Sequence, residues 1–194
     1  MTSLPKKPAK DVDVFWAEIA ACDHCLQIYE NDDVFLAALE AYAGAGLQQG
    51  EAVILIATSV HLKLLEERLA RSGFDLAAAA ERDQYIALDA AAAIDTFVDN
   101  GWPDEQRFNA FVFSLLERAR PRYPKVRAFG EMVALLWAKG HCGATIRLEH
   151  LWARMCQSER FSLFCAYPRG GFTQNAQHSM MDVHLAHSVV FNAA

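Results

Sequence analysis

The chain has 194 residues, of which 53% are hydrophobic and 22% charged, and its formal net charge is −6 at neutral pH. That apolar content is enough to build a packed core, which excludes an intrinsically disordered chain. The acidic balance gives no general attraction to nucleic acid or to anionic membranes, and the apolar runs are far shorter than the ~20 residues that span a bilayer.

The termini and the cysteines indicate the compartment. The N-terminal lysines precede no apolar stretch, so no signal peptide is predicted. Five cysteines, an odd number, argue against a disulfide scaffold in a chain long enough to form its own core. We therefore expect a cytoplasmic protein with reduced thiols, built as a partly flexible lead over residues 1–21 and one domain over residues 22–190.

The first half of the chain alternates strand and helix signals. Strands are predicted at residues 24–29, 52–57 and 85–88. The second of these is a continuous apolar run, typical of a strand buried on both faces. Asp32 and Asp33 are placed to cap the helix after the first strand, and Ser59 to cap the helix after the second.

The same alternation continues in the second half. Pro103 suits the first turn of a helix that ends before Pro121, and other helical stretches are predicted at residues 90–100, 131–139, 142–155 and 174–187. Two more strands are predicted at residues 126–129 and 161–167. Five strands alternating with helices predict a three-layer α/β domain, a mostly parallel sheet of five or more strands with helices on both faces.

Ligands of such sheets bind beyond the carboxyl ends of the strands, so these ends are the first place to look for a site. The candidate residues there are Tyr29, Glu30, Thr58, Asp89, Glu131, Met132 and Tyr167. The loop over residues 30–33 has neither glycine nor lysine, and no GxGxxG occurs, so neither ATP nor a dinucleotide is expected. Asp89 and Glu131 could act as an acid–base pair, but the favoured interpretation is that both are ordinary helix caps.

Other catalytic and metal signals are weak. No GxSxG nucleophile elbow occurs. Cys22 and Cys25 have CxxC spacing, and a zinc site would need two more ligands from the set His141, Cys142, His178, His184 and His187. Because nothing in the sequence brings these residues together, the sequence predicts no metal, no cofactor and no catalytic residues.

Two further groups of residues have both an ordinary and a functional interpretation. Large apolar side chains surround the last two strands and either belong to the core or line a pocket for a small molecule: Met132, Trp137, Trp152, Phe164 and Tyr167. A basic run either complements a helix dipole or docks an acidic partner: Arg118, Arg120, Arg122, Lys125 and Arg127.

Several segments taken together resemble a known family. The motifs RAFGEM at residues 127–132 and CAYP at residues 165–168 stand in this order with residues 24–30, 50–58, 148–152 and 184–188. They resemble the MEDS domain, the methanogen and methylotroph sensory domain also found in a dichloromethane-responsive repressor. The resemblance implies a fold similar to the RecA/KaiC class of P-loop proteins without the phosphate-binding loop. It also implies a non-catalytic sensor of small, hydrocarbon-like organic molecules in prokaryotic signalling.

By position, the resemblance points to the following residues as the ones that contact a ligand: His24, Tyr29, Glu30, Glu131, Trp137, Tyr167 and His187. Only about 22 residues precede the matched region and almost none follow it, so we expect either a domain that signals by contacting a partner or an isolated fragment of a larger sensor that carries its own output module. We therefore expect the domain to signal through a partner protein such as a transcription regulator, with no direct contact to nucleic acid or membrane; a homodimer stays open. Two alternatives also stay open, namely a small metal-dependent enzyme and a structural adaptor whose strand-end pocket is filled by its own side chains.

Overall fold

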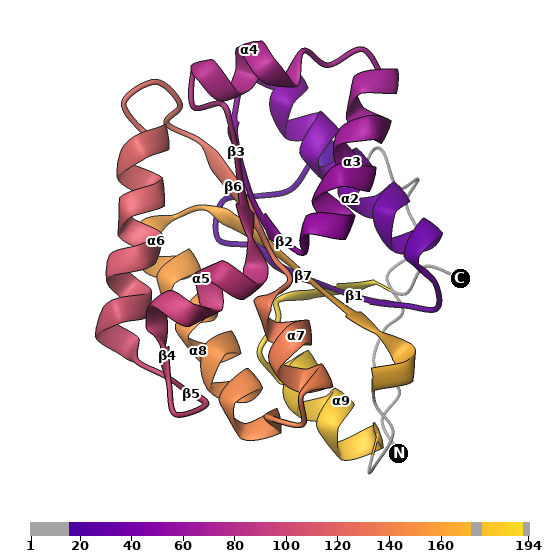
Figure 1. The fold of residues 1–194 in the computed structure, drawn as a ribbon, viewed down its shortest axis with the longest axis vertical. Coiled ribbons are helices and arrows are strands. Elements are labelled where there is room, and N and C mark those ends of the chain that lie inside the picture. Colours follow the sequence, from indigo (N-terminus) through magenta and orange to yellow (C-terminus); the bar gives the residue numbers. More distant parts are fainter. Residues whose placement is uncertain (1–15, 172–175, 192–194) are drawn as a thin grey trace.

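Six parallel strands form the central sheet in the computed structural model, which describes residues 16–171 and 176–191 (Figure 1). The order across the sheet is β3-β2-β6-β7-β1-β8. The strands are β1 (His24–Tyr29), β2 (Ala52–Ala57), β3 (Tyr85–Asp89), β6 (Val126–Gly130), β7 (Ser162–Pro168) and β8 (Val189–Phe191). The predicted parallel α/β sheet is confirmed, with β8 as an edge strand that the sequence did not indicate.

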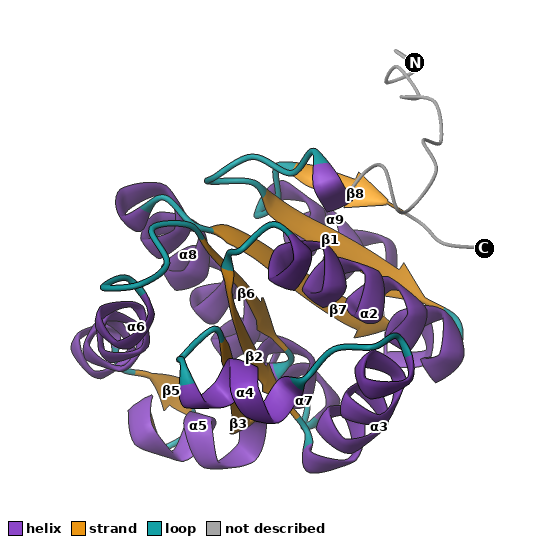
Figure 2. Cartoon of the chain, turned by 90° about the horizontal axis from the view of Figure 1, so that it is seen from above, coloured by secondary structure: helices purple, strands orange, loops and turns teal. Residues whose placement is uncertain are grey.

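Helices cover both faces of this sheet (Figure 2). One face is covered by α2 (Asp32–Gln48), α3 (Ser59–Arg71) and α4 (Leu76–Glu81). The other face is covered by α5 (Ala90–Phe97), α6 (Glu105–Ala119), α7 (Met132–Ala138), α8 (Cys142–Glu159) and α9 (Ala176–Leu185). No helix in the described part of the chain is long and apolar enough to cross a membrane.

Side-chain alternation along the strands divides the core in two. On β2, Ile54 and Ile56 point toward the α5–α8 face, whereas Val53 and Leu55 point toward the α2–α3 face. Both sets are fully or almost fully buried, as expected for a parallel strand that is sandwiched between helices. Trp16, inside the predicted lead, is buried on the α2–α3 face, where the centroid of its ring lies 5.0 Å from that of Tyr42.

The helix boundaries correct several predictions. The N-caps are Asn31 and Thr58, each one residue before the predicted cap, because their side chains accept the N–H groups three residues on. Pro103 does not begin a helix. It pairs in a small antiparallel hairpin of β4 (Val98–Asp99) and β5 (Trp102–Pro103), and Asp104 caps α6. Residues 174 and 175 of the last predicted helix lie outside the described residues.

Three of the five residues of the basic run are paired with acidic side chains. Arg127 is fully buried, with its Nε 2.5 Å from Glu51 Oε2 and its Nη1 donating to the carbonyls of Trp16 and Tyr42. Arg118 pairs with Asp83, and Arg120 pairs with Glu159. The alternation of strand residues explains the burial, because Arg127 is the second residue of β6 and faces the α2 layer.

Candidate functional site

Three of the predicted residues meet at the carboxyl edge of the sheet. Tyr29 ends β1, Thr58 follows β2 and Glu131 follows β6. Strands β2 and β6 are neighbours in the sheet, which brings Thr58 and Glu131 together. The Oε2 atom of Glu131 accepts the backbone N–H of Thr58 at 2.8 Å, and its Oε1 atom lies 2.8 Å from His61 Nδ1. We call Tyr29, Thr58, His61 and Glu131 the strand-end group.

His61 was missed by the sequence reasoning because it belongs to a helix and does not end a strand. The Thr58 side chain accepts the backbone N–H of His61, which fixes His61 in the first turn of α3. Glu131 occupies the N-cap position of α7 but makes no side-chain cap bond. Its carboxylate instead reaches across to the start of α3, so one side chain ties the beginnings of two helices together.

Aromatic rings form one side of the strand-end group. Tyr29 stacks on Phe35 with ring centroids 4.8 Å apart, and Phe35 in turn meets the His61 ring edge-on at 5.0 Å. Burial, followed by the charges of Glu131 and Asp32, raises the pKa of Tyr29 above its usual range, so the phenol stays neutral.

The charge of the group is set by the Glu131–His61 contact. The hydrogen bond to Glu131 raises the pKa of His61, while burial works in the opposite direction. Asp32, whose Oδ2 lies 3.9 Å from His61 Nε2, adds to the rise. The group therefore offers an acceptor and a strong donor beside apolar rings, which suits a small molecule with one polar end.

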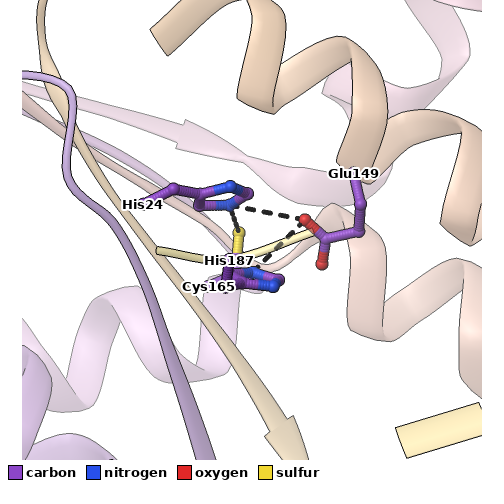
Figure 3. A group of neighbouring side chains, drawn as sticks. All are labelled: His24, Glu149, Cys165 and His187. Carbon is purple, nitrogen blue, oxygen red and sulfur yellow. Dashed lines mark hydrogen bonds and ion pairs between the residues drawn. The ribbon is translucent and has the colours of Figure 1, made fainter. Parts of the chain in front are cut away.

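A second group of predicted residues lies elsewhere, on the α7–α9 side of the sheet (Figure 3). His24 begins β1, and His187 precedes β8, so neither histidine is at a carboxyl end. They meet with ring centroids 3.9 Å apart. Glu149 of α8 and Cys165 of β7 complete the set His24, Glu149, Cys165 and His187, which we call the His/Cys group.

The His/Cys group is closely spaced. His24 Nε2 lies 3.4 Å from Cys165 Sγ and 3.4 Å from Glu149 Oε2, and His187 Nε2 lies 3.4 Å from the same carboxylate oxygen. The side chains of Glu149 and His187 are fully buried, and that of His24 is 4% exposed. Tyr167, another predicted residue, donates its hydroxyl hydrogen bond to Glu149 Oε1.

Burial dominates the ionisation of this group. It lowers the pKa of His24, with a further contribution from His187. It raises the pKa values of Cys165 and Tyr167, and the nearby Glu149 charge acts in the same direction. In this arrangement the thiol and the phenol are therefore neutral, and Glu149 is the only carboxylate among them.

The remaining predicted site residues have structural contacts. Glu30 is half exposed and pairs with Arg169. Asp89 caps α5 by accepting the N–H groups of its first turn. Met132 is fully buried in the core, and the indole of Trp137 donates to the carbonyl of Gly171 at 2.7 Å.

The structure does not gather the predicted CxxC ligands. Cys25 points into the core on the α2 side, opposite to the Cys165 face, and Cys22 contacts the backbone of Gln157. Cys142 is exposed, and His184 is half-buried beside His187. The side chain of His178 lies outside the described residues.

Glu149 and Cys165 were not singled out from the sequence. Two signals could have identified them. Cys165 and Tyr167 are two residues apart on one strand and so must share a face, and Glu149 lies within one of the segments that carry the family resemblance.

A cleft of about 550 Å³ at the amino edge of the sheet, lined in part by Glu51, Lys125 and Ser162, contains neither group.

Comparisons with known proteins support the family resemblance. The sequence model of the MEDS family, described as the methanogen/methylotroph, DcmR sensory domain, matches residues 23–185. No curated protein matches this chain. A solved structure from Pyrococcus horikoshii OT3 superposes with a TM-score of 0.62 at 11% identity, over 95% of this chain and 88% of the other. At that identity the likeness concerns the fold alone.

Proposed function

The chain belongs to the MEDS family of sensory domains, and we propose that it is a non-catalytic sensor that binds a small organic molecule at the strand-end group. The bound state is relayed to a partner protein, such as a transcription regulator. The observation that carries this proposal is the double contact of Glu131, which holds both the Thr58 N–H and His61.

The position of Glu131 gives the sensor a means of changing shape. A ligand with a hydrogen-bond donor competes for the carboxylate, and a ligand with an acceptor competes for His61. Either event loosens the connection between the start of α3 and the start of α7. A ligand shifts an equilibrium between two states only by the difference in its affinity for them. Here the Glu131–His61 contact is present in the ligand-free state and absent from the bound state.

The helix α3 offers the route from the ligand to a partner. His61 belongs to its first turn, and Val60 and Leu64, four residues apart on its surface, are 64% and 39% exposed. Residues at this spacing lie on one side of a helix. A change at His61 therefore acts on the helix that presents these apolar side chains to a partner.

The test begins with the ligand. Native mass spectrometry of the protein isolated from its own cells, compared with its denatured mass, identifies a small molecule that dissociates on unfolding. Calorimetric titration with that molecule then compares the wild type with Glu131→Gln. Loss of a hydrogen bond to a charged group predicts a roughly 10- to 100-fold weaker affinity.

The matched control is Glu30→Gln, which removes a carboxylate at the same edge of the sheet but outside the strand-end group. It should bind as the wild type does. Equal affinities of the wild type and Glu131→Gln, with both folded by circular dichroism, would contradict this placement of the ligand. A protein that carries no small molecule and gives no heat on titration with alcohols of one to four carbons or with halogenated methanes would contradict ligand sensing itself.

A further inference from the structure

The two histidines of the His/Cys group hold their protons on the ring nitrogen that does not face Glu149. His24 Nδ1 lies 3.0 Å from the carbonyl oxygen of Ala186, and His187 Nδ1 lies 2.6 Å from that of Val183. A carbonyl oxygen only accepts hydrogen bonds, so each Nδ1 carries the proton and donates it. In a neutral imidazole the Nε2 atom then has a lone pair and no proton.

These lone pairs converge on a third acceptor. Both Nε2 atoms lie 3.4 Å from Glu149 Oε2, and that carboxylate oxygen makes no hydrogen bond. The Nε2 atom of His187 is likewise buried without a hydrogen-bond partner. With both rings neutral, three electron-rich atoms face one another inside the protein, and the donor beside them is the Cys165 thiol, whose sulfur lies 3.4 Å from His24 Nε2. Glu149 Oε2 and His187 Nε2 stay buried without a partner, at a cost of about 1–3 kcal/mol each.

A cation resolves this conflict, and the spacing fits one. A tetrahedron with metal–nitrogen and metal–oxygen bonds of about 2.1 Å has edges of about 3.4 Å. That is the separation of His24 Nε2 from Glu149 Oε2 and of His187 Nε2 from the same atom. All four potential ligand atoms lie within 4.8 Å of one another, so the side chains need only small movements to surround an ion.

The hydrogen bonds around His24, His187 and Glu149 are those that orient the ligands in known metal sites. Histidine ligands of metals donate their other ring N–H to a backbone carbonyl or a carboxylate, which fixes the tautomer and the ring orientation. His24 and His187 both do so here. The ligating carboxylate is hydrogen-bonded in turn, by the hydroxyl of Tyr167. These partners orient the ligand atoms before any ion arrives.

The charges also balance. A divalent ion bound to the Glu149 carboxylate, the Cys165 thiolate and two neutral histidines gives a site with no net charge, which suits a fully buried position. On binding, the sulfur–metal bond forms as the thiol proton leaves to solvent, as for any cysteine ligand. Nitrogen, sulfur and carboxylate oxygen together favour Zn²⁺, and a set of four protein ligands is typical of a structural zinc site.

We propose that His24, Glu149, Cys165 and His187 bind one zinc ion in a closed, structural site. This site is separate from the strand-end group and does not depend on the sensor function. The ion would join β1, β7 and α8 to the segment between α9 and β8, and would hold the edge strand β8 and the helix α9 onto the sheet.

The test measures metal directly. The chain is produced in medium with added zinc, washed with a weak chelator and analysed by elemental mass spectrometry, which should give about one zinc per chain. Cobalt(II) loading of the same protein should give a thiolate-to-cobalt charge-transfer absorption. That absorption should vanish in Cys165→Ser and persist in Cys25→Ser, because Cys25 is also buried on a sheet strand but faces the opposite core.

A second variant tests the surrounding contacts without removing a ligand. Tyr167→Phe removes the hydrogen bond to Glu149 and should weaken zinc binding about 10- to 100-fold in competition with a chelator. A wild-type chain that is folded by circular dichroism yet holds no zinc and gives no cobalt absorption would overturn the proposal. A cobalt absorption that survives Cys165→Ser but is lost in Cys25→Ser would also overturn it.

Discussion

The contact between Glu131 and His61 should stabilise the fold in a way that depends on pH. Glu131 Oε1 and His61 Nδ1 are 2.8 Å apart, and the Glu131 and His61 side chains are only 8% and 13% exposed. A hydrogen bond between charged groups in such a position contributes about 1.5–3 kcal/mol. We therefore expect a double-mutant cycle with Glu131→Gln and His61→Gln to give a coupling energy of that size at pH 5.5.

The sign of the pH dependence follows from the pKa of His61, which the folded state raises through its hydrogen bond to Glu131. The folded protein holds the proton more tightly than the unfolded chain, whose histidine titrates near 6.5. This contribution is complete below pH ~6.5 and is lost as pH rises through the raised folded-state pKa. At pH 9 a neutral N–H donates to the charged Glu131 carboxylate, so the ion-pair contribution is lost and the coupling should fall to the lower end of this range, about 1.5 kcal/mol.

Urea unfolding followed by circular dichroism, repeated at both pH values for the wild type and the three variants, measures this coupling. The ion pair of Arg68 with Asp33 serves as a control that contains no histidine, since its Nη2–Oδ1 distance is also 2.8 Å. Its coupling should be the same at both pH values. A Glu131–His61 coupling below about 0.5 kcal/mol, or one that does not change with pH, would refute the reasoning.

Three further predictions concern the α2 face of the core and use the same unfolding assay. Gly46→Ala places a methyl group 2.6 Å from Cδ of the buried Arg127 and should cost about 1–3 kcal/mol; an unchanged midpoint would mean that the arginine can move aside. Arg127→Met leaves the Glu51 carboxylate without its buried partner and should lower the free energy of unfolding by about 3–5 kcal/mol. An unchanged free energy of unfolding would mean that water reaches Glu51. Tyr42→Phe removes the hydroxyl that donates to the Ala128 carbonyl at 3.0 Å and should cost about 1–3 kcal/mol; a smaller loss would mean that the bond adds little.

The fold was largely predictable because the strands of a parallel sheet leave a strong local signal. The apolar run Ala52–Ala57 is buried on both faces, as its composition indicates. Short elements left no such signal. The helix Leu76–Glu81 is one and a half turns of mostly alanine, and β8 has three residues that pair with β1. Their positions depend on tertiary contacts, which local patterns do not encode.

The strand-end group was half predictable for a similar reason. Thr58 and Glu131 follow strands that the alternation already identified, and the topology of such sheets brings strand ends together. Their contact still required β2 and β6 to be neighbours, although more than 60 residues and three other strands, β3, β4 and β5, separate them in sequence. His61 was missed because its role depends on the cap at Thr58, which lies one residue before the predicted one.

The His/Cys group could not have been predicted from spacing. Its members come from the start of β1, the middle of α8, the middle of β7 and the segment before β8. They meet because β1 pairs with β7 so that Leu26 lies opposite Cys165, and because β8 adds to the far edge of β1. The CxxC pair had favourable spacing, yet Cys25 faces the other core. Side-chain direction decided which cysteine joined the histidines, and spacing did not.

Each group has one member on or next to a helix of the contacting pair α7 and α8, and this connects the two proposals. Glu131 stands at the start of α7, and Glu149 lies in the middle of α8. Thr145 of α8 donates its hydroxyl to the carbonyl of Val133 in α7, one of the contacts that join these helices. A zinc ion at Glu149 would fix α8 to the sheet, so that a ligand at Glu131 moves α7 against a rigid support. A signal requires one part to stay in place while another moves, and under the two proposals these parts would be the adjacent helices α8 and α7.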